Sequence, residues 1–410
     1  MDFIGLSGSV FSAKALLASA GEGSVYTVEG DKSLLLKILT RPLTARQLEK
    51  LKTLAAYKPK PEHTAIPIEV VIDPATRKPV GFVQRFYSQA VPLTRALDSH
   101  GRSALKLPDD LEFRVKLCRL LAEAIARVHA ANLVIGDVSD GNFMIGCDRP
   151  GRVDIVYVID CNSFQVTIRS QRGTECFVSG VATEQYAAPE VQPTDWATSL
   201  RSVYSDNFGF AVLAWKLLFG GSHPFAVITP RSVDVPPMGQ RIEKRLFPFR
   251  PGSPMPADWK APTIQPSLSD LPGAVRQMFF ETFSSSDPRD RPLIDPWCHA
   301  LRNWERELKP GNIERIVRYW DADLASRVAK VVAAVHSMGP RAAVLLLIVA
   351  MFVLLPRLEF SASDQTTTGS PNPSPLIPPG KEAPSRKPKP IRKVDPELFP
   401  ESIWPPVPRK

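Results

Sequence analysis

Residues 133–145 read LVIGDVSDGNFMI, an apolar stretch that contains an acidic side chain and an amide. Asp137 and Asn142 stand five positions apart, with strand-forming residues before and after them. Burying such polar groups without partners costs free energy. Both residues therefore need a reason to be there, either as turn residues or as groups that carry chemistry.

The stretch after Asn142, FMIGCDRPGRVDIVYVID, has the pattern of strand, turn and strand. An antiparallel hairpin brings the beginning of its first strand beside the end of its second. Because Asn142 precedes the first strand and Asp160 ends the second, we expect Asp137, Asn142 and Asp160 to meet at one edge. Two carboxylates and an amide oxygen are hard ligands, suited to Mg²⁺ held together with phosphate oxygens. In the competing interpretation, Asp137 caps a turn, and Asn142 and Asp160 are turn residues at the ends of strands.

In their order along the chain, these residues resemble the motifs of the eukaryotic-type Ser/Thr protein kinase family. GDVSDGN is similar to the catalytic loop, with Asp137 at the position of the base and Asn142 at a metal position. DCN is similar to D-F-G, with Asp160 as the second metal ligand. The resemblance extends from about residue 10 to about residue 305, and it implies ATP and Mg²⁺ as cofactors.

Three further motifs agree with this resemblance. TEQYAAPE resembles the end of the activation segment, with Glu190 as its acid. SDNFGFAVLAWKLLFGG resembles the helix that follows, in which Asp206 is expected to brace the catalytic loop. DPRDRP supplies Arg291, which such folds pair with the acid of the activation segment.

The N-terminal hundred residues have the pattern of short strands, and helical periodicity begins at Leu111. A strand-rich start before a helix-rich body predicts an α+β fold, and the resemblance implies a small β-rich lobe and a larger helical lobe. Lys37 in LLLKIL resembles the lysine that holds ATP phosphates. Its expected partner is Glu49, on an amphipathic helix predicted over 44–56, because an enclosed ammonium needs a counter-ion.

A hairpin predicted from IPIEVVID and PVGFVQRF ends at three residues that the resemblance makes the hinge, whose backbone meets the adenine: Gln84, Arg85 and Phe86. The glycine loop over the phosphates has two alignments. One begins at Gly21 and Gly23 and puts Tyr26 at the third glycine. The other, which we prefer, puts Gly23 at the third glycine and Val25 at the valine, since it leaves room for two strands before the lysine. In this alignment, alanine occupies the first two glycine positions. Alanine restricts the backbone conformation where the loop approaches the phosphates.

Four positions depart from the family pattern. Gly136 replaces an arginine that binds a phosphate on the activation segment, which implies activity without that phosphorylation or a different switch. Ser139 replaces a lysine that contacts the transferred phosphate, and positive charge is needed there. Cys161 and Asn162 replace the phenylalanine and glycine of D-F-G. These departures are similar to a divergent bacterial branch, the kinase-like proteins linked to tellurite-resistance clusters.

The chain has 410 residues, a net charge of +9 and 41 prolines. Its charges are dispersed, so no nucleic-acid partner is expected. The five cysteines lie far apart without a CxxC pair, which indicates a reducing compartment and neither a zinc site nor a disulfide framework. The N-terminus lacks a basic start before an apolar run, so we expect no signal peptide.

One segment suggests a membrane. Residues 342–356 are uncharged and lie between two arginines; as a helix they span roughly 22 Å, short of the ~30 Å hydrocarbon core. Snorkelling arginines make up the difference in a single span; a buried or interfacial helix is the alternative. A span would anchor the chain in the inner or plasma membrane with its kinase part in the cytosol.

The predicted organisation has four parts. They are a kinase-like domain at 1–306, a helical connection at 307–340, the span at 341–357 and a proline-rich, disordered tail at 358–410. The tail permits docking to a polyproline-binding partner.

The predicted function is Mg²⁺·ATP-dependent phosphorylation of Ser or Thr on an unidentified protein. The alternatives are a nucleotide-binding pseudokinase that acts as a signalling scaffold, favoured by Gly136 and Ser139, and phosphotransfer to a small molecule.

Overall fold

The computed structural model describes residues 1–147, 151–170, 173–230 and 234–309. Within this part, strands dominate up to Arg85 and helices dominate from Leu111 onward. The predicted α+β class, with a β-rich N-terminal region before a helical one, is therefore confirmed.

Six N-terminal strands form a closed barrel in the order β1-β2-β3-β4-β6-β5. Their bounds are β1 Asp2–Gly5, β2 Val10–Ala20, β3 Gly23–Val28, β4 Asp31–Leu39, β5 Glu69–Ile72 and β6 Pro79–Arg85. The two predicted hairpins are present as β3–β4 and β5–β6. The closure was not predicted: Ile4 in β1 pairs with Val10 on one side and with Ile72 on the other. A closed sheet leaves no strand edge exposed.

Helix α1, Ala45–Ala56, lies at the predicted position. Thr44 caps it, because the Thr44 hydroxyl accepts from the Gln47 N–H at 3.2 Å and the Gln47 side chain accepts from the Thr44 N–H at 3.0 Å. This reciprocal pair satisfies two donors at the helix start. Leu51 and Leu54 are buried, and so is Lys50, on the same face.

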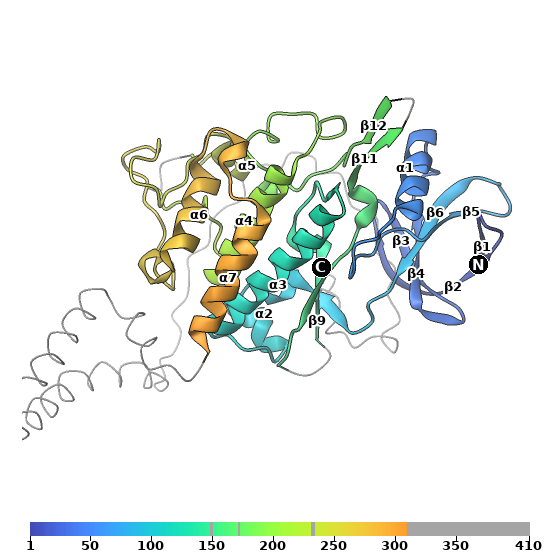
Figure 1. Ribbon diagram of the computed structural model, residues 1–410, viewed down its shortest axis with the longest axis horizontal. Helices are drawn as coiled ribbons and strands as arrows, with labels where there is room; N and C mark the ends of the chain where they lie inside the picture. Colours follow the sequence, from blue (N-terminus) through green and yellow to red (C-terminus); the bar gives the residue numbers. More distant parts are fainter. Residues whose placement is uncertain (148–150, 171–172, 231–233, 310–410) are drawn as a thin grey trace, which may run out of the picture. The chain divides into compact units, whose positions relative to one another are not determined.

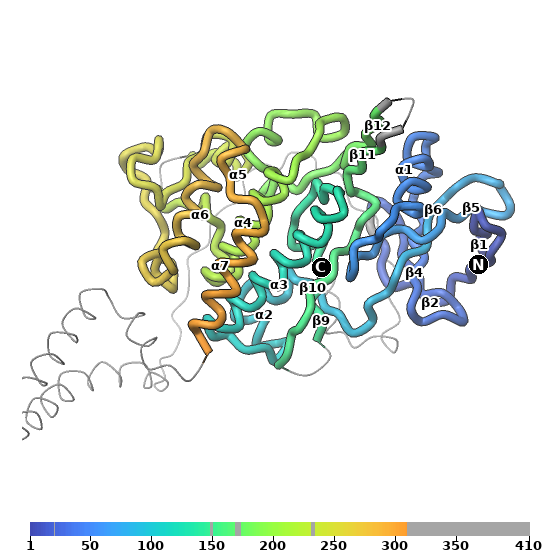
Figure 2. Tube along the Cα trace, in the orientation of Figure 1, coloured from blue at the N-terminus to red at the C-terminus, as the bar shows by residue number. Residues whose placement is uncertain are grey.

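The helical region contains α2 Ser99–Ala104, α3 Leu111–Ala130, α4 Val203–Leu218, α5 Met238–Glu243, α6 Gly273–Ser284 and α7 Ile294–Leu308. Asn132 follows α3 with φ 55°, the left-handed conformation common just after a helix end. Helix α4 is apolar around most of its circumference and contacts both α3 and α6. Figures 1 and 2 show α4 among these helices. The Trp215 ring of α4 packs against several phenylalanines, with centroids 5.5 Å from Phe247 and 5.3 Å from Phe279.

Two small sheets are formed by strands that follow the barrel in sequence, one strand before α2 and α3 and the others between α3 and α4. One has the order β10-β9-β7, from Ile155–Val158, Phe143–Gly146 and Ala90–Pro92. The other has the order β12-β11-β8, from Gly173–Phe177, Gln165–Ser170 and Leu133–Val134. Strands β9 and β10 are the predicted hairpin after Asn142, with Phe143 paired to Val158.

No helix within the described part of residues 1–309 is both long and apolar enough to cross a membrane. The apolar run at 341–357 and the tail at 358–410 lie outside the described residues, as does the helical connection from residue 310 onward.

Candidate functional site

The register of the β9–β10 hairpin brings Asp137, Asn142 and Asp160 together. The Nδ2 of Asn142 donates to the Asp137 backbone oxygen at 2.8 Å and to its carboxylate at 3.2 Å. The backbone oxygen of Asn142 accepts from the Ile159 N–H at 2.9 Å, and Asp160 is the next residue. The amide nitrogen of Asn142 is thus committed to Asp137, which leaves its oxygen as the amide atom able to ligate a metal.

The surroundings of Asp137 suit a proton acceptor. Burial raises the pKa of the Asp137 carboxyl, and the negative charge of Asp160 acts in the same direction. Hydrogen bonds from Thr183 and Asn142 oppose this shift because they stabilise the carboxylate. A carboxylate whose pKa is raised toward the working pH is a better general base.

The ammonium of Lys37 lies in the same cluster. It donates to the Asp160 carboxylate and, at 3.2 Å, to the amide oxygen of Asn162. Glu22 lies 3.7 Å away, and only 12% of the Lys37 side chain is exposed. Val25 pairs with Lys37 between β3 and β4.

Glu49 does not pair with Lys37. Its carboxylate binds Lys52 at 2.9 Å on the exposed face of α1. The register of the helix explains the difference, because the apolar face that packs inward contains Leu51 and Leu54 and turns position 49 outward. The expected role of Glu49 as the residue that orients Lys37 is therefore not seen in this structure.

Lys50 occupies the inward position instead, and our reading of the sequence missed it. Its ammonium donates to the Val178 and Ser179 backbone oxygens at 2.8 and 3.4 Å. Burial lowers the pKa of Lys50 to about 8. The signal was available, since Lys50 lies directly before Leu51 and four residues before Leu54, within one helical face.

The predicted glycine loop lies at the connection between β2 and β3. Gly21 and Glu22 form the turn between β2 and β3, and a side chain at Gly23 would meet the Ile38 backbone oxygen. Gly23 is thus needed for the close approach of two strands.

The hinge residues lie at the end of β6. Gln84 and Arg85 pair with Leu35 and Leu34 of β4. The Phe86 N–H donates to the Ser33 backbone oxygen at 2.7 Å, so it does not offer that donor to an adenine in this structure. The Gln84 Oε1 is buried without a hydrogen bond from any described residue.

A cavity of about 750 Å³ lies beside Asp160. Its walls come from the Gly21–Glu22 turn, α1 with Gln47 and Lys50, and the segment 177–181. The described residues contain no cluster of three or more His, Cys, Asp or Glu side chains that fits a metal ion. The donor set nevertheless fits Mg²⁺ with a nucleotide, because the Asn142 and Asp160 oxygens are hard ligands and phosphate oxygens complete the coordination.

Asp206 braces the backbone directly before Asp137, as predicted. Its carboxylate accepts from the Ile135 and Gly136 N–H groups, both at 2.8 Å. His129 Nε2 lies 2.9 Å from the same carboxylate. Only 2% of Asp206 is exposed, so these hydrogen bonds satisfy a charge that would otherwise be costly to bury.

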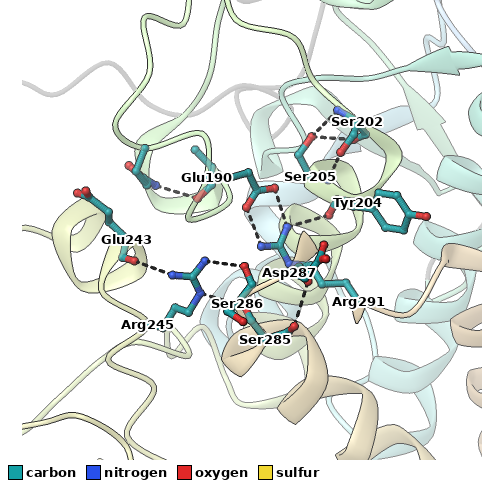
Figure 3. Close-up of polar contacts among 12 residues, drawn as sticks. Glu190, Ser202, Tyr204, Ser205, Glu243, Arg245, Ser285, Ser286, Asp287 and Arg291 are labelled. Carbon is teal, nitrogen blue, oxygen red and sulfur yellow. Dashed lines mark hydrogen bonds and ion pairs between the residues drawn. The ribbon is translucent and has the colours of Figure 1, made fainter. Parts of the chain in front are cut away.

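The predicted ion pair between Glu190 and Arg291 is also confirmed (Figure 3). Both terminal nitrogens of Arg291 lie 2.7 Å from the two Glu190 oxygens. The Arg291 side chain is fully buried and stacks over the Phe208 ring at 5.3 Å. This bidentate pair fixes the end of the activation segment to the helical region.

His223 holds the turn that precedes Glu190. Its Nε2–H donates to the Gln185 backbone oxygen at 2.9 Å, while its Nδ1 accepts from the Phe225 N–H at 3.2 Å. Burial lowers the pKa of His223 to about 4. The neutral ring is thus the form that fits, and protonation of Nδ1 would break the bond from Phe225.

This predicts an acid-dependent loss of stability. The contribution of His223 is complete above its unfolded pKa near 6.5 and is lost as the pH falls toward 4, by roughly 2 kcal/mol at pH 5. Urea unfolding at pH 7 and pH 5 should show the advantage of the wild type over His223→Gln shrinking by that amount. A difference that is the same at both pH values would contradict this account.

No protein-family model matches the chain. The chain is similar to Protein kinase YegI of Escherichia coli strain K12, with 29% identity over 300 residues, 72% of this chain and 44% of that protein. It is equally similar to Protein kinase YegI of Escherichia coli O157:H7, with 29% identity over 310 residues, 74% of this chain and 46% of that protein. The chain therefore spans less than half the length of these curated relatives. The similarity supports a relationship to a divergent bacterial family of protein kinases.

Proposed function

We propose that this chain transfers the γ-phosphoryl group of Mg²⁺·ATP to serine or threonine hydroxyls of a protein. The observation that carries the proposal is the convergence of Asp137, Asn142 and Asp160 beside the ammonium of Lys37. The similarity to kinases of Escherichia coli supports it at a coarser level.

Each group has a role in this proposal. Asp137 orients the acceptor hydroxyl and accepts its proton. The oxygens of Asn142 and Asp160 hold Mg²⁺, and Lys37 binds phosphate oxygens. Bound Mg²⁺ supplies charge neutralisation on the phosphates, while positioning by the protein supplies much of the remaining rate.

A nucleotide-binding pseudokinase is the second candidate. Ser139 stands where a lysine would contact the transferred phosphate, and it is buried with 5% exposure. Loss of that charge weakens transfer without removing the nucleotide contacts of Lys37. A protein that binds nucleotide and transfers no phosphate would fit this alternative.

Four further proposals rest on the sequence. They are membership of the tellurite-resistance branch, a membrane anchor at 341–357, a cytosolic kinase part, and docking of the tail to a polyproline-binding partner.

The test is transfer of labelled γ-phosphate by the full chain to itself and to a mixture of Ser- and Thr-bearing peptides. We expect acid-stable label on serine or threonine, abolished when a chelator removes Mg²⁺. Lys37→Met should lower transfer by about 100-fold or more, because the phosphates lose their positioned cation.

The matched control is Lys52→Met, the same change on the exposed face of α1, where Lys52 binds Glu49. It should retain activity, and so should Glu49→Gln. Nucleotide binding without transfer by the wild type would favour the pseudokinase. Equal losses in Lys37→Met and Lys52→Met would contradict the assigned role of Lys37.

A further inference from the structure

Gly136, directly before Asp137, packs against side chains from two distant segments. Its φ is 78°, in the left-handed region. A Cβ at this position would lie 2.5 Å from the Ser179 Cβ and 3.4 Å from the Arg201 Cγ. The space beside the catalytic loop is therefore already filled by Ser179, which follows β12, and by Arg201, which precedes α4.

Arg201 is a buried cation with 5% exposure, and it binds main-chain oxygens. One terminal nitrogen donates to Ser199, at 3.2 Å to its backbone oxygen and also to its hydroxyl. The other donates to the Val181 backbone oxygen at 3.5 Å. The Arg201 backbone is bridged by Gln165, which accepts from its N–H at 2.8 Å and donates to its oxygen at 2.7 Å.

The carboxylates of Asp137 and Asp206 partly offset the effect of burial on the charge of Arg201. Burial lowers the pKa of Arg201, while the negative charges of Asp137 and Asp206 oppose that shift. A buried cation is tolerated when such charges and hydrogen bonds compensate its desolvation. Arg201 thus lies within the electrostatic reach of the proposed catalytic base.

The segment that Arg201 binds leads directly to Asp137. The Ser179 hydroxyl donates to the Val181 backbone oxygen at 3.3 Å, the same oxygen that Arg201 binds. Two residues later, Thr183 lines the same small cavity as Asp137, and its side chain and backbone both lower the pKa of the Asp137 carboxyl by favouring the carboxylate. A fixed Val181 therefore fixes the donors that orient Asp137.

The opposite side of the segment is held by a second buried cation. Lys50 of α1 donates to the Val178 and Ser179 backbone oxygens. Both cations thus bind main-chain carbonyls, which are present in the unmodified chain.

We propose that Arg201 is a positioning residue that holds residues 179–183 against Asp137 without phosphorylation of this segment. The inference rests on the proposed kinase function and specifies how that function is regulated. A phosphate on Ser179 is the competing arrangement. Ser179 is 7% exposed and packs on Gly136 and Arg201, so the geometry favours the unmodified serine.

The test uses the full chain after treatment with a phosphatase, with intact mass showing that no phosphate remains. We expect the treated wild type to retain its initial rate of transfer to peptide. Arg201→Met should lower kcat by about tenfold or more while the KM for ATP stays within about twofold, because the change acts through Asp137 and not through nucleotide binding. Arg201→Lys, which keeps a cation and a donor, should recover part of the loss.

A double variant separates positioning from general destabilisation. Thr183→Val removes the hydroxyl that bonds to Asp137. If Arg201 acts through Thr183, Arg201→Met with Thr183→Val should be no slower than the slower single variant, whereas independent effects would multiply.

Hydrogen exchange distinguishes the failure of this inference from the failure of the proposed function. Arg201→Met should speed amide exchange at residues 181–183 and leave the core of α4 protected. That result supports the positioning role of Arg201 even if the wild type transfers no phosphate. In that case only the kinase proposal fails. If Arg201→Met does not fold, the comparison is made with Arg201→Lys.

Three results would overturn the inference. The first is a phosphatase-treated wild type that is inactive until Ser179 is phosphorylated. The second is a folded Arg201→Met variant with an unchanged kcat. The third is unchanged exchange at residues 181–183 in the folded variant.

Discussion

Asp137→Asn is expected to lower kcat by about 10²- to 10⁴-fold, the range that general acid–base groups contribute. The amide has the size of the carboxylate and keeps an oxygen for the bonds from Thr183 and Asn142. It cannot accept the proton of the acceptor hydroxyl. Binding of Mg²⁺·ATP should change little, because Asn142 and Asp160 remain. The measurements are single-turnover transfer and titration with a non-hydrolysable ATP analogue.

Asp154→Asn is the matched control for this variant. Asp154 directly precedes β10 of the same hairpin and binds Lys116 and Arg152 at the surface. The Asp154→Asn variant makes the same chemical change in the same hairpin and should leave kcat unchanged. If Asp137→Asn transfers phosphate as fast as Asp154→Asn, Asp137 is not the catalytic base.

Glu190→Ala is expected to lower the free energy of unfolding by about 3 kcal/mol, the low end of the loss for a buried pair, because 30% of the Glu190 side chain is exposed. The Arg291 side chain has no solvent exposure, so its charge would remain buried without its bidentate partner. A Glu190→Leu, Arg291→Met double variant should recover much of the loss, because neither charge is then left unpaired. Urea unfolding of the wild type and the two variants measures both differences.

Arg289→Ala is the control for the pair. Arg289 binds Asp287 close by in the sequence, but 78% of its side chain is exposed. Solvent screens such a pair, so the urea midpoint should not move measurably. If Glu190→Ala and Arg289→Ala shift the urea midpoint equally, the burial of Arg291 does not explain the contribution of the Glu190–Arg291 pair to stability.

The candidate site could be predicted where strand register alone determines the geometry. The pairing of Phe143 with Val158 places Asn142 beside Ile159, so the approach of Asp160 follows from the hairpin. The pairing of Glu190 with Arg291 was predicted from their motifs and from the resemblance to kinases. No local pattern would have joined residues 101 positions apart.

Other features depend on tertiary packing that local patterns do not specify. The four residues of β1 are too few to show strand alternation, so closure of the barrel was missed. The expected partner of Lys37 came from the resemblance, while the apolar face of α1 selects Lys50 as the inward residue. Arg201 lies in an irregular stretch whose contacts come from three separate segments, and the sequence gives no sign of them.

In the proposed mechanism, Asn142 and Asp160 hold a divalent ion at the phosphate end of a nucleotide site whose base is Asp137. A crystal structure of the full chain with Mg²⁺ and a non-hydrolysable ATP analogue tests this arrangement. We expect Mg²⁺ about 2.0–2.1 Å from the Asn142 Oδ1 and from an Asp160 carboxylate oxygen, with Lys37 on phosphate oxygens. Bound nucleotide whose metal contacts neither residue would contradict it.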